Sequence, residues 1–413
     1  MWLFLILSFL IGVIFFTIPI KWCIYFICMV PLGLVGSLTR FGINIGGFPV
    51  SLAWSLRIFL FSRLLLSLLV SKAPERFLSP VPNKVFSLLI MGSIISMLIH
   101  RTWTVYGLRI IVNWITLLLI SGNIIVFFRR DELLKLWKFS VSSILFVSIG
   151  VVFQLIKAKS YHLMPVLDYR GEGFFSTPGY MGYYSTTIWA LLLPLLLLHK
   201  RNVGLMLLTL ANFALIYMSL MRGPWIVAIA SFIVIAYTLY PKALIASPIM
   251  VGIIASIPYT KLRFKEFYEI GFDLSNPSFL SGRIGAWQIL FEASKERILD
   301  GYGFGSYYQL SNNLFGYYLH AHCDPLLILL SLGVIGLFVY LLFYLISLRY
   351  ILKNTLEVNS ALCRILRASG LGILIVLCAG LWDNIIGNFD ILSKFFIVIS
   401  GVEVLKRSRR RQL

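Results

Sequence analysis

Long apolar segments recur along the whole chain and constrain its fold more than any other feature. A helix needs about 20 apolar residues to cross roughly 30 Å of hydrocarbon. Twelve or thirteen segments meet or approach that length: 1–20, 22–38, 50–71, 85–100, 108–128, 139–157, 183–198, 204–220, 224–240, 243–258, 324–348, 366–382 and 388–405. Backbone groups in lipid must be hydrogen-bonded internally, so these segments are expected to be helices. The predicted fold is an all-α, polytopic integral membrane helical bundle with 12–13 transmembrane helices.

The composition excludes several classes of protein. Hydrophobic residues make up 59% of the chain and charged residues 13%, against about 45–50% and 25% in soluble domains. A soluble, disordered or coiled-coil protein is therefore not expected. The 36 basic and 16 acidic residues give a net charge of +20, which in a membrane protein marks cytoplasmic loops. No basic stretch is interleaved with stacking aromatics in a polar domain, so no nucleic-acid partner is predicted.

Basic residues set the predicted orientation of the helices. From residue 72 onward, alternate connectors are basic, and the positive-inside rule places them in the cytoplasm. The opposite, external face then holds 100–107, 158–182, 221–223, 259–322 and 383–388. The orientation of the N-terminal segments stays open. Residues 1–413 are predicted to form one membrane domain, with 259–322 as a large external loop whose short helices carry part of an active site. That segment holds six basic and six acidic residues, and its neutrality favours the external side.

Arg283 is a candidate ligand for an anion. Ser281 is a helix-capping residue type, and apolar residues recur after it at helical spacing, so a helix is expected to begin there. A cation in the first turn opposes the helix dipole. A bound phosphate would reverse that cost, because the guanidinium and the unpaired helix N–H groups would both bind it. The alternative is a solvated arginine or an ion pair with a loop carboxylate.

Two further arginines lie at predicted external boundaries. Arg222 lies between two apolar runs, where the following Gly223-Pro224 favours a tight break. Arg170 is a possible supporting residue, with Glu172 as a potential partner. For both arginines the alternative is a boundary side chain that reaches the aqueous interface.

His320 and His322 are two of five histidines and lie at the outer end of a long span, just before Asp324. A neutral imidazole can accept a proton from a hydroxyl nucleophile. The alternative is a structural histidine at the interface. No acidic or cysteine cluster completes a metal site, so no metal and no cofactor are predicted. The 301–305 segment (GYGFG) is expected only to reverse the chain, and Gly333 and Gly336 to permit close helix packing.

These residues carry a family resemblance. The motif S-G-R-x-x-x-W, the GYGFG segment and the run from His320 and His322 to Gly333-Val334-Ile335-Gly336 together resemble the O-antigen ligase and polymerase superfamily of bacterial membrane glycosyltransferases. The resemblance is strongest over residues 165–340. It implies transfer of a glycan from an undecaprenyl-diphosphate carrier to an acceptor hydroxyl at the periplasmic face of the inner membrane, with inversion and without a metal.

The resemblance also implies roles for individual residues. The motif histidine falls on His322, which would activate the acceptor hydroxyl, and the diphosphate-binding arginines fall on Arg222 and Arg283. The position after the motif histidine is often Asn, Ser or Gln in the family, but here it is Cys323. A thiol is a weaker hydrogen-bond partner, so another residue is expected to orient His322, with His320 and Asp324 as candidates.

Several functions stay open at this stage. The preferred hypothesis is a surface-polysaccharide polymerase, whose acceptor is a lipid-linked glycan and which can work with a chain-length regulator. A ligase would instead use the lipid A core as acceptor. A transporter or flippase would need charges deep within several spans. Such charges are scarce in this sequence, and Arg57 and Arg63 are the main exceptions. A non-catalytic scaffold would leave the external arginines and His322 unexplained.

Overall fold

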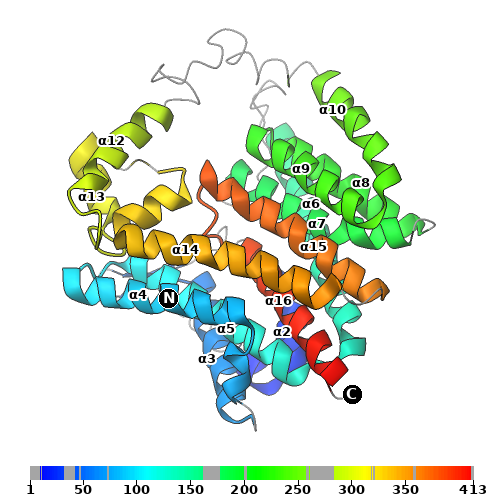
Figure 1. Cartoon of the computed structure of the whole chain (residues 1–413), viewed down its shortest axis with the longest axis horizontal. Coiled ribbons are helices and arrows are strands. Elements are labelled where there is room, and N and C mark those ends of the chain that lie inside the picture. Colours follow the sequence, from blue (N-terminus) through cyan, green and yellow to red (C-terminus); the bar gives the residue numbers. More distant parts are fainter. Residues whose placement is uncertain are drawn as a thin grey trace.

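The computed structural model of the protein describes residues 10, 12–31, 42–45, 48–71, 74–160, 177–199, 202–256, 260, 283–317, 319, 321–356 and 360–410. This part of the chain is almost entirely helical (Figure 1). The helices are α2 (Ile20–Met29), α3 (Leu52–Leu69), α4 (Val81–His100), α5 (Val105–Phe127), α6 (Leu133–Ser160), α7 (Pro178–Leu198), α8 (Val203–Met218), α9 (Arg222–Leu239), α10 (Ala246–Ser256), α12 (Arg283–Lys295), α13 (Tyr307–Phe315), α14 (Asp324–Leu356), α15 (Ala361–Cys378) and α16 (Phe389–Arg410). The strands β1 (Gly42–Ile45) and β2 (Phe48–Ser51) pair as a small antiparallel hairpin. Apart from this hairpin, the all-α prediction is confirmed.

Seven of the described helices are long and apolar enough to cross a membrane, namely α4, α5, α6, α7, α9, α14 and α15, the last counted to Leu381. They confirm a polytopic helical membrane protein. The other predicted spans differ in length or charge. Helices α2, α8 and α10 have 10, 16 and 11 residues, and α3 and α16 contain charged residues. Predicted spans at 1–20 and 22–38 extend beyond the described residues.

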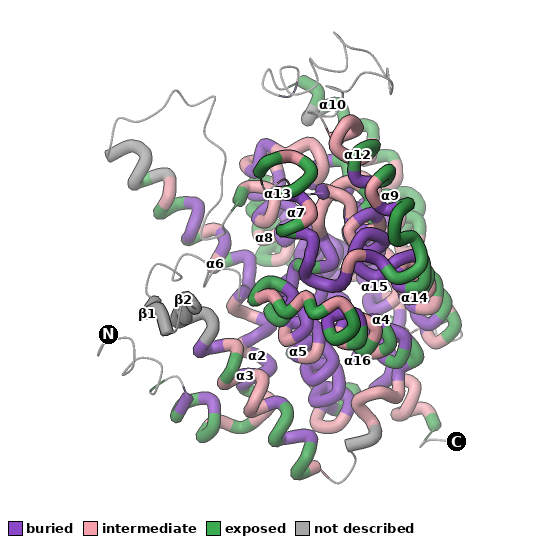
Figure 2. Tube along the Cα trace, turned by 90° about the vertical axis from the view of Figure 1, so that its left-hand side faces the viewer, coloured by how far each residue is buried: buried purple, intermediate pink, exposed green. Residues whose placement is uncertain are grey.

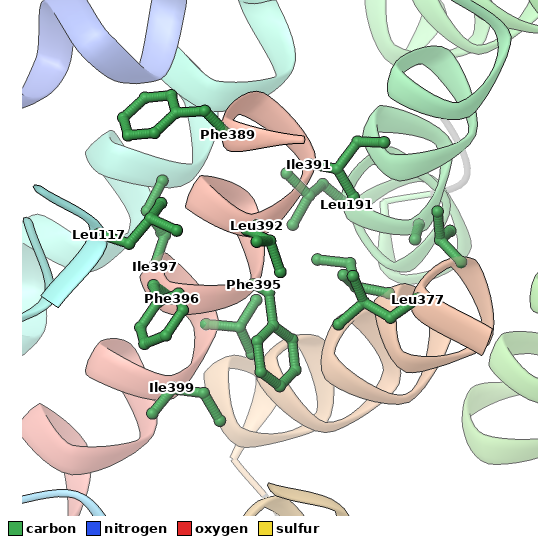
Figure 3. Packing of buried hydrophobic residues seen from close by; sticks show 14 of the residues in the cluster. Leu117, Leu191, Leu377, Phe389, Ile391, Leu392, Phe395, Phe396, Ile397 and Ile399 are labelled. Carbon is green, nitrogen blue, oxygen red and sulfur yellow. The ribbon is translucent and has the colours of Figure 1, made fainter. Parts of the chain in front are cut away.

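Helix α16 lies in the centre of the bundle. Its apolar side chains, including Leu392, Phe395 and Phe396, point toward Leu117 of α5 and Leu377 of α15 (Figure 3). Every residue from Phe389 to Leu405 is buried. The outer helices instead expose many apolar side chains, and Figure 2 shows exposed residues along α4 and α14 around a buried interior. Such an exposed apolar surface suits contact with lipid tails.

Charged side chains within the bundle bind backbone carbonyls. Arg63 donates to the carbonyls of Phe15 and Ile18 at 3.1 and 3.3 Å. Lys394 of α16 is 1% exposed and donates to the Cys28 carbonyl at 2.5 Å. The sequence analysis did not single out Lys394 among the mid-span charges. These bonds give Arg63 and Lys394 a structural role, because a buried cation is tolerated only when it is paired.

Helix α14 is interrupted at Gly333. This residue has φ 66° and ψ −169°, so the backbone leaves the helical conformation there. A Cβ at Gly333 would collide with the carbonyl of Leu299, and the amide of Val334 donates to the Ile298 carbonyl at 2.7 Å. Gly333 therefore does more than permit helix packing. It opens the helix so that the backbone before α13 can pair with it.

The 301–305 segment is part of the same junction. The amide of Tyr302 donates to the Leu330 carbonyl at 2.7 Å. The Thr102 hydroxyl, between α4 and α5, donates to the Phe304 carbonyl at 2.9 Å. The expectation that GYGFG only reverses the chain is therefore wrong. The segment joins the break in α14 to the turn between α4 and α5, and so fixes the direction of the first part of α14.

Candidate functional site

His322 and Asp383 form the centre of the candidate site. His322 lies just before α14, and its Nδ1 is 3.2 Å from Oδ1 of Asp383, in the loop between α15 and α16. The two side chains are 34% and 19% exposed, so the pair is sheltered but reachable. His322 has φ 47°, which is uncommon for a residue other than glycine. Such conformations cost energy and are found at functional sites.

The charge state of Asp383 follows from its neighbours. Burial of the carboxyl acts to raise its pKa, but interactions with three residues outweigh it. The hydrogen bond and charge of His322, the hydrogen bond from the Asn384 amide and the charge of Arg283 hold the pKa of Asp383 below its ordinary value. An ionised carboxylate offers only acceptors, so Nδ1 of His322 carries the hydrogen in this contact. Nε2 is then the basic nitrogen of the ring.

Asp324 fixes the loop that carries Asp383. It is fully buried at the start of α14, and its carboxylate accepts hydrogen bonds from the amides of Ile385 (3.0 and 3.1 Å) and Ile386 (2.7 Å). A Cβ at Gly380 would collide with the same carboxylate. Asp324 was predicted as a candidate to orient His322. The residue that contacts the ring is Asp383, and Asp324 contacts the backbone next to it.

Arg283 reaches the same loop from α12. Its Nη1 donates to the carbonyl of Trp382 at 2.6 Å, and its charge acts on the neighbouring Asp383. Arg283 is the first described residue of α12, and the sequence predicted it in the first turn of a helix. The guanidinium has five N–H donors, so this single bond leaves others for a ligand. The helix N-terminus beside it favours an anion.

Arg222 begins α9 beside the same tryptophan. A Cβ at the next residue, Gly223, would collide with the Tyr183 hydroxyl and would lie 3.3 Å from Nε1 of Trp382. The Tyr183 hydroxyl also interacts with Asp383 and lies in the field of Arg283. The start of α9, α7, α12 and the 382–388 loop thus meet around Tyr183 and Trp382. The structure therefore places the backbone at Arg222 near the 382–388 loop, whose Asp383 contacts His322.

Two predicted supporting residues, Arg170 and His320, lie outside the described residues. Cys323 is half-buried, and burial raises the pKa of its thiol. The thiol therefore stays protonated near neutral pH. Cys323 stands at the position after the motif histidine, where a stronger hydrogen-bond partner was expected from the resemblance. In the structure Asp383 supplies the polar partner for His322.

An apolar cavity of about 470 Å³ is lined by Ile284 and Cys323, the residues that follow Arg283 and His322 in the chain. It lies between α12 and the first half of α14, on the side of α12 that carries Ile284 and Trp287. Its remaining lining residues are Gln288, Phe291, Cys323, Pro325, Leu326, Leu329 and Leu337. The indole of Trp287 donates to the Ala321 carbonyl at 2.6 Å, which fixes α12 against the residue before His322. An apolar chain attached to a group bound at Arg283 would fit this cavity.

The sequence analysis missed Asp383, Trp382 and Tyr183. It assigned 383–388 to the external face without selecting a residue from it. The available signal was a carboxylate and an amide, Asp383 and Asn384, in a short external connector between two apolar runs. That signal does not say which distant residue the carboxylate meets, so the partner of His322 could not be read from it.

The fold and this site define a polytopic helical membrane protein with a histidine–carboxylate pair and arginines at one end of the bundle. Residues 205–341, about a third of the chain, match the family model described as O-Antigen ligase. The resemblance expected from the sequence is confirmed over this part. The match includes Arg222, Arg283 and His322 but ends before Asp383. A search of curated proteins finds no match to the chain.

Proposed function

We propose that this protein is a glycosyltransferase of the O-antigen ligase and polymerase type, in the bacterial inner membrane with its site facing the periplasm. Its donor would be a glycan on an undecaprenyl-diphosphate carrier. The observation that carries this proposal is the contact of His322 with Asp383, beside Arg283 on the Trp382 carbonyl. The family match over residues 205–341 supports it.

His322 would act as the general base. With its hydrogen on Nδ1 and held by Asp383, the ring presents Nε2 to the acceptor hydroxyl. As the hydroxyl loses its proton, the ring becomes positively charged. The adjacent Asp383 carboxylate stabilises that charge.

Arg283 and Arg222 would bind the diphosphate of the donor. The diphosphate is already a good leaving group, so the site needs mainly to hold it and stabilise the charge that develops. Arg283 has the planar geometry for bidentate phosphate contacts, and the N-terminus of α12 adds backbone donors. No metal or cofactor is required in this scheme.

The transfer step balances with these groups. The acceptor O–H bond breaks, and its proton goes to Nε2 of His322. The acceptor oxygen forms a bond to the anomeric carbon of the donor. The bond from that carbon to the diphosphate oxygen breaks, and its electron pair leaves with the diphosphate, near the arginines. Attack opposite the leaving group gives inversion.

The carrier lipid would occupy the apolar cavity. A polyprenyl chain has no polar group beyond its diphosphate, and Ile284, the residue after Arg283, lines the cavity. Burial of apolar surface there would stabilise the bound donor by about 25 cal/mol per Å². The donor would then enter from the membrane rather than from water.

The proposal favours a polymerase, with a lipid-linked glycan as acceptor and a possible chain-length regulator as partner. The alternative is a ligase that uses the lipid A core. A transporter is less well supported, because the half-buried Arg63 and the buried Lys394 bind backbone carbonyls instead of lining a path.

Replacement of His322 tests the function. We expect His322→Ala to abolish glycan transfer while the protein level in the membrane is retained. The matched control is His199→Ala, at an exposed histidine that ends α7, which should keep activity. Full activity of His322→Ala would remove the catalytic role. Deletion of the gene separates the two acceptors on a gel of surface glycan. Core with one repeat unit indicates a polymerase, and uncapped core indicates a ligase.

A further inference from the structure

A second group of cationic side chains lies near the site but takes no part in the scheme above. Arg57 is in the second turn of α3, and Arg109 is in the second turn of α5. Helix α5 is fixed to the catalytic loop, because the indole of Trp114 donates to the Ile386 carbonyl at 3.0 Å. Arg109 lies between that contact and the external end of α5. Both arginines are therefore near the same end of the bundle as His322.

Four helices meet around these arginines. Helices α3 and α5 pack against each other, and the charge of Arg57 acts on Arg109 and on Tyr180 in the first turn of α7. The Tyr180 hydroxyl donates to Oδ2 of Asp390, at the start of α16, at 2.6 Å. Tyr180 precedes Tyr183 by one helical turn. The arginine group is therefore next to the region around Tyr183 and Trp382 but distinct from it.

Among the described residues, no hydrogen-bond acceptor is seen for either guanidinium group. Nε of Arg57 is buried and makes no hydrogen bond in the described structure. Within the described ranges, neither Arg57 nor Arg109 forms an ion pair. Asp390 is nearby, but it is shared with the buried Lys394. Two like charges close together at a membrane boundary are costly. A bound anion would reverse this cost.

We infer that Arg57 and Arg109 form a second phosphate site, which holds the diphosphate of a lipid-linked acceptor glycan. This inference rests on the proposed function. Arg109 is exposed, so it is open to a ligand. Arg57 is half-buried and adds positive charge to the site. The arginines assigned to the donor lie on α9 and α12, and this pair lies on α3 and α5. In an inverting displacement the acceptor approaches opposite the leaving group, so a separate anion site suits the acceptor.

The chemistry of the site also bears on the choice of acceptor. A polymerase joins two molecules of the same class, each with a diphosphate at the membrane surface. It therefore needs two phosphate sites at one level of the bilayer. Both pairs of arginines lie near the external ends of their helices. A phospholipid head group is the other source of phosphate at this level, and the experiment distinguishes it.

Binding of undecaprenyl diphosphate, without a glycan, tests the inference by native mass spectrometry of the full chain. We expect the wild type to bind two molecules, and Arg57→Gln, Arg109→Gln and Arg283→Gln to bind one each. The control is Arg101→Gln, at an exposed arginine after α4, which should bind two. Thermal unfolding of each variant shows whether it is folded.

Several outcomes would overturn the inference. One is a wild type that binds a single molecule, lost in Arg283→Gln, which leaves the proposed function standing. Others are two molecules retained by both Arg57→Gln and Arg109→Gln, or equal competition at the second site by phosphatidylglycerol. If no undecaprenyl diphosphate binds at all, the proposed function fails as well.

Kinetics give a second readout that a merely structural role would not produce. Arg109→Gln should raise the KM for the acceptor about tenfold, equivalent to about 1.4 kcal/mol, with the donor KM and kcat unchanged. An equal rise in both KM values, or a fall in kcat alone, would contradict a site for the acceptor.

Discussion

His322 and Asp383 are 61 positions apart in the chain, yet Nδ1 of the histidine lies 3.2 Å from Oδ1 of the aspartate. Asp324, two residues after His322, accepts hydrogen bonds from the amides of Ile385 and Ile386 in the same loop. The start of α14 and the loop before α16 are therefore joined twice. This double connection fixes the imidazole.

Asp383→Asn should reduce the rate of glycan transfer by about 10²-fold or more, within the range of general acid–base effects. The amide cannot stabilise the imidazolium, and it can present a donor to Nδ1. The measurement is the initial rate with saturating donor and acceptor. The neighbouring Asn384→Asp keeps the loop polar and serves as the control. A rate unchanged by Asp383→Asn would show that His322 does not depend on this carboxylate.

The stability of the protein should depend on pH through Asp383. Its pKa in the folded protein lies below the ordinary value, so its contribution is present above about pH 4, the pKa of an unfolded carboxyl. That contribution is lost as the pH falls through the folded value. Thermal unfolding in detergent should therefore separate wild type from Asp383→Asn at pH 6 and bring them together in acid. A constant difference across this range would contradict the prediction.

Asp324→Asn should lower the free energy of unfolding by about 2 kcal/mol or more, because an amide nitrogen, which cannot accept, would replace one of the two oxygens that accept hydrogen bonds from the buried amides of Ile385 and Ile386. The loop that carries Asp383 would loosen, so the rate should also fall. Asp300→Asn is the control, since that side chain is 59% exposed and should show little change. Chemical denaturation in detergent measures both variants. Equal stability of the two would exclude the role of Asp324.

Gly333→Ala should destabilise the protein by about 2 kcal/mol or more, because φ is 66° and a Cβ would meet the Leu299 carbonyl. The break in α14 and the pairing with the 301–305 segment would both be disturbed. Gly92→Ala in α4 is the matched control, with no atom within 4 Å of its Cβ. The melting temperatures of the two variants check this. A stable Gly333→Ala would show that the helix can close without loss.

Arg283→Lys should raise the KM for the donor about tenfold, because an ammonium group cannot make the bidentate contact with phosphate. It would also alter the bond to the Trp382 carbonyl. Arg101→Lys, at an exposed position, is the control for a change of cation. Rates at varied donor concentration measure the effect. An unchanged donor KM would count against a diphosphate at Arg283.

The local pattern of the sequence was enough to predict the helical membrane fold, most of the long helices and a helix with Arg283 in its first turn. Apolar runs and helix-start residues act over one or a few turns, so they can be read along the chain. The sequence pattern also indicated His322 and Arg222 as candidate site residues, and their roles stay predictions.

The pairing of these residues came only from the packed structure. The contact of His322 with Asp383 and the pairing of the 298–302 backbone with the break at Gly333 join segments that lie far apart in the chain. Hydropathy and spacing do not encode which helices become neighbours. That choice is made when side chains from several helices pack together, and it places a carboxylate from one loop against an imidazole from another.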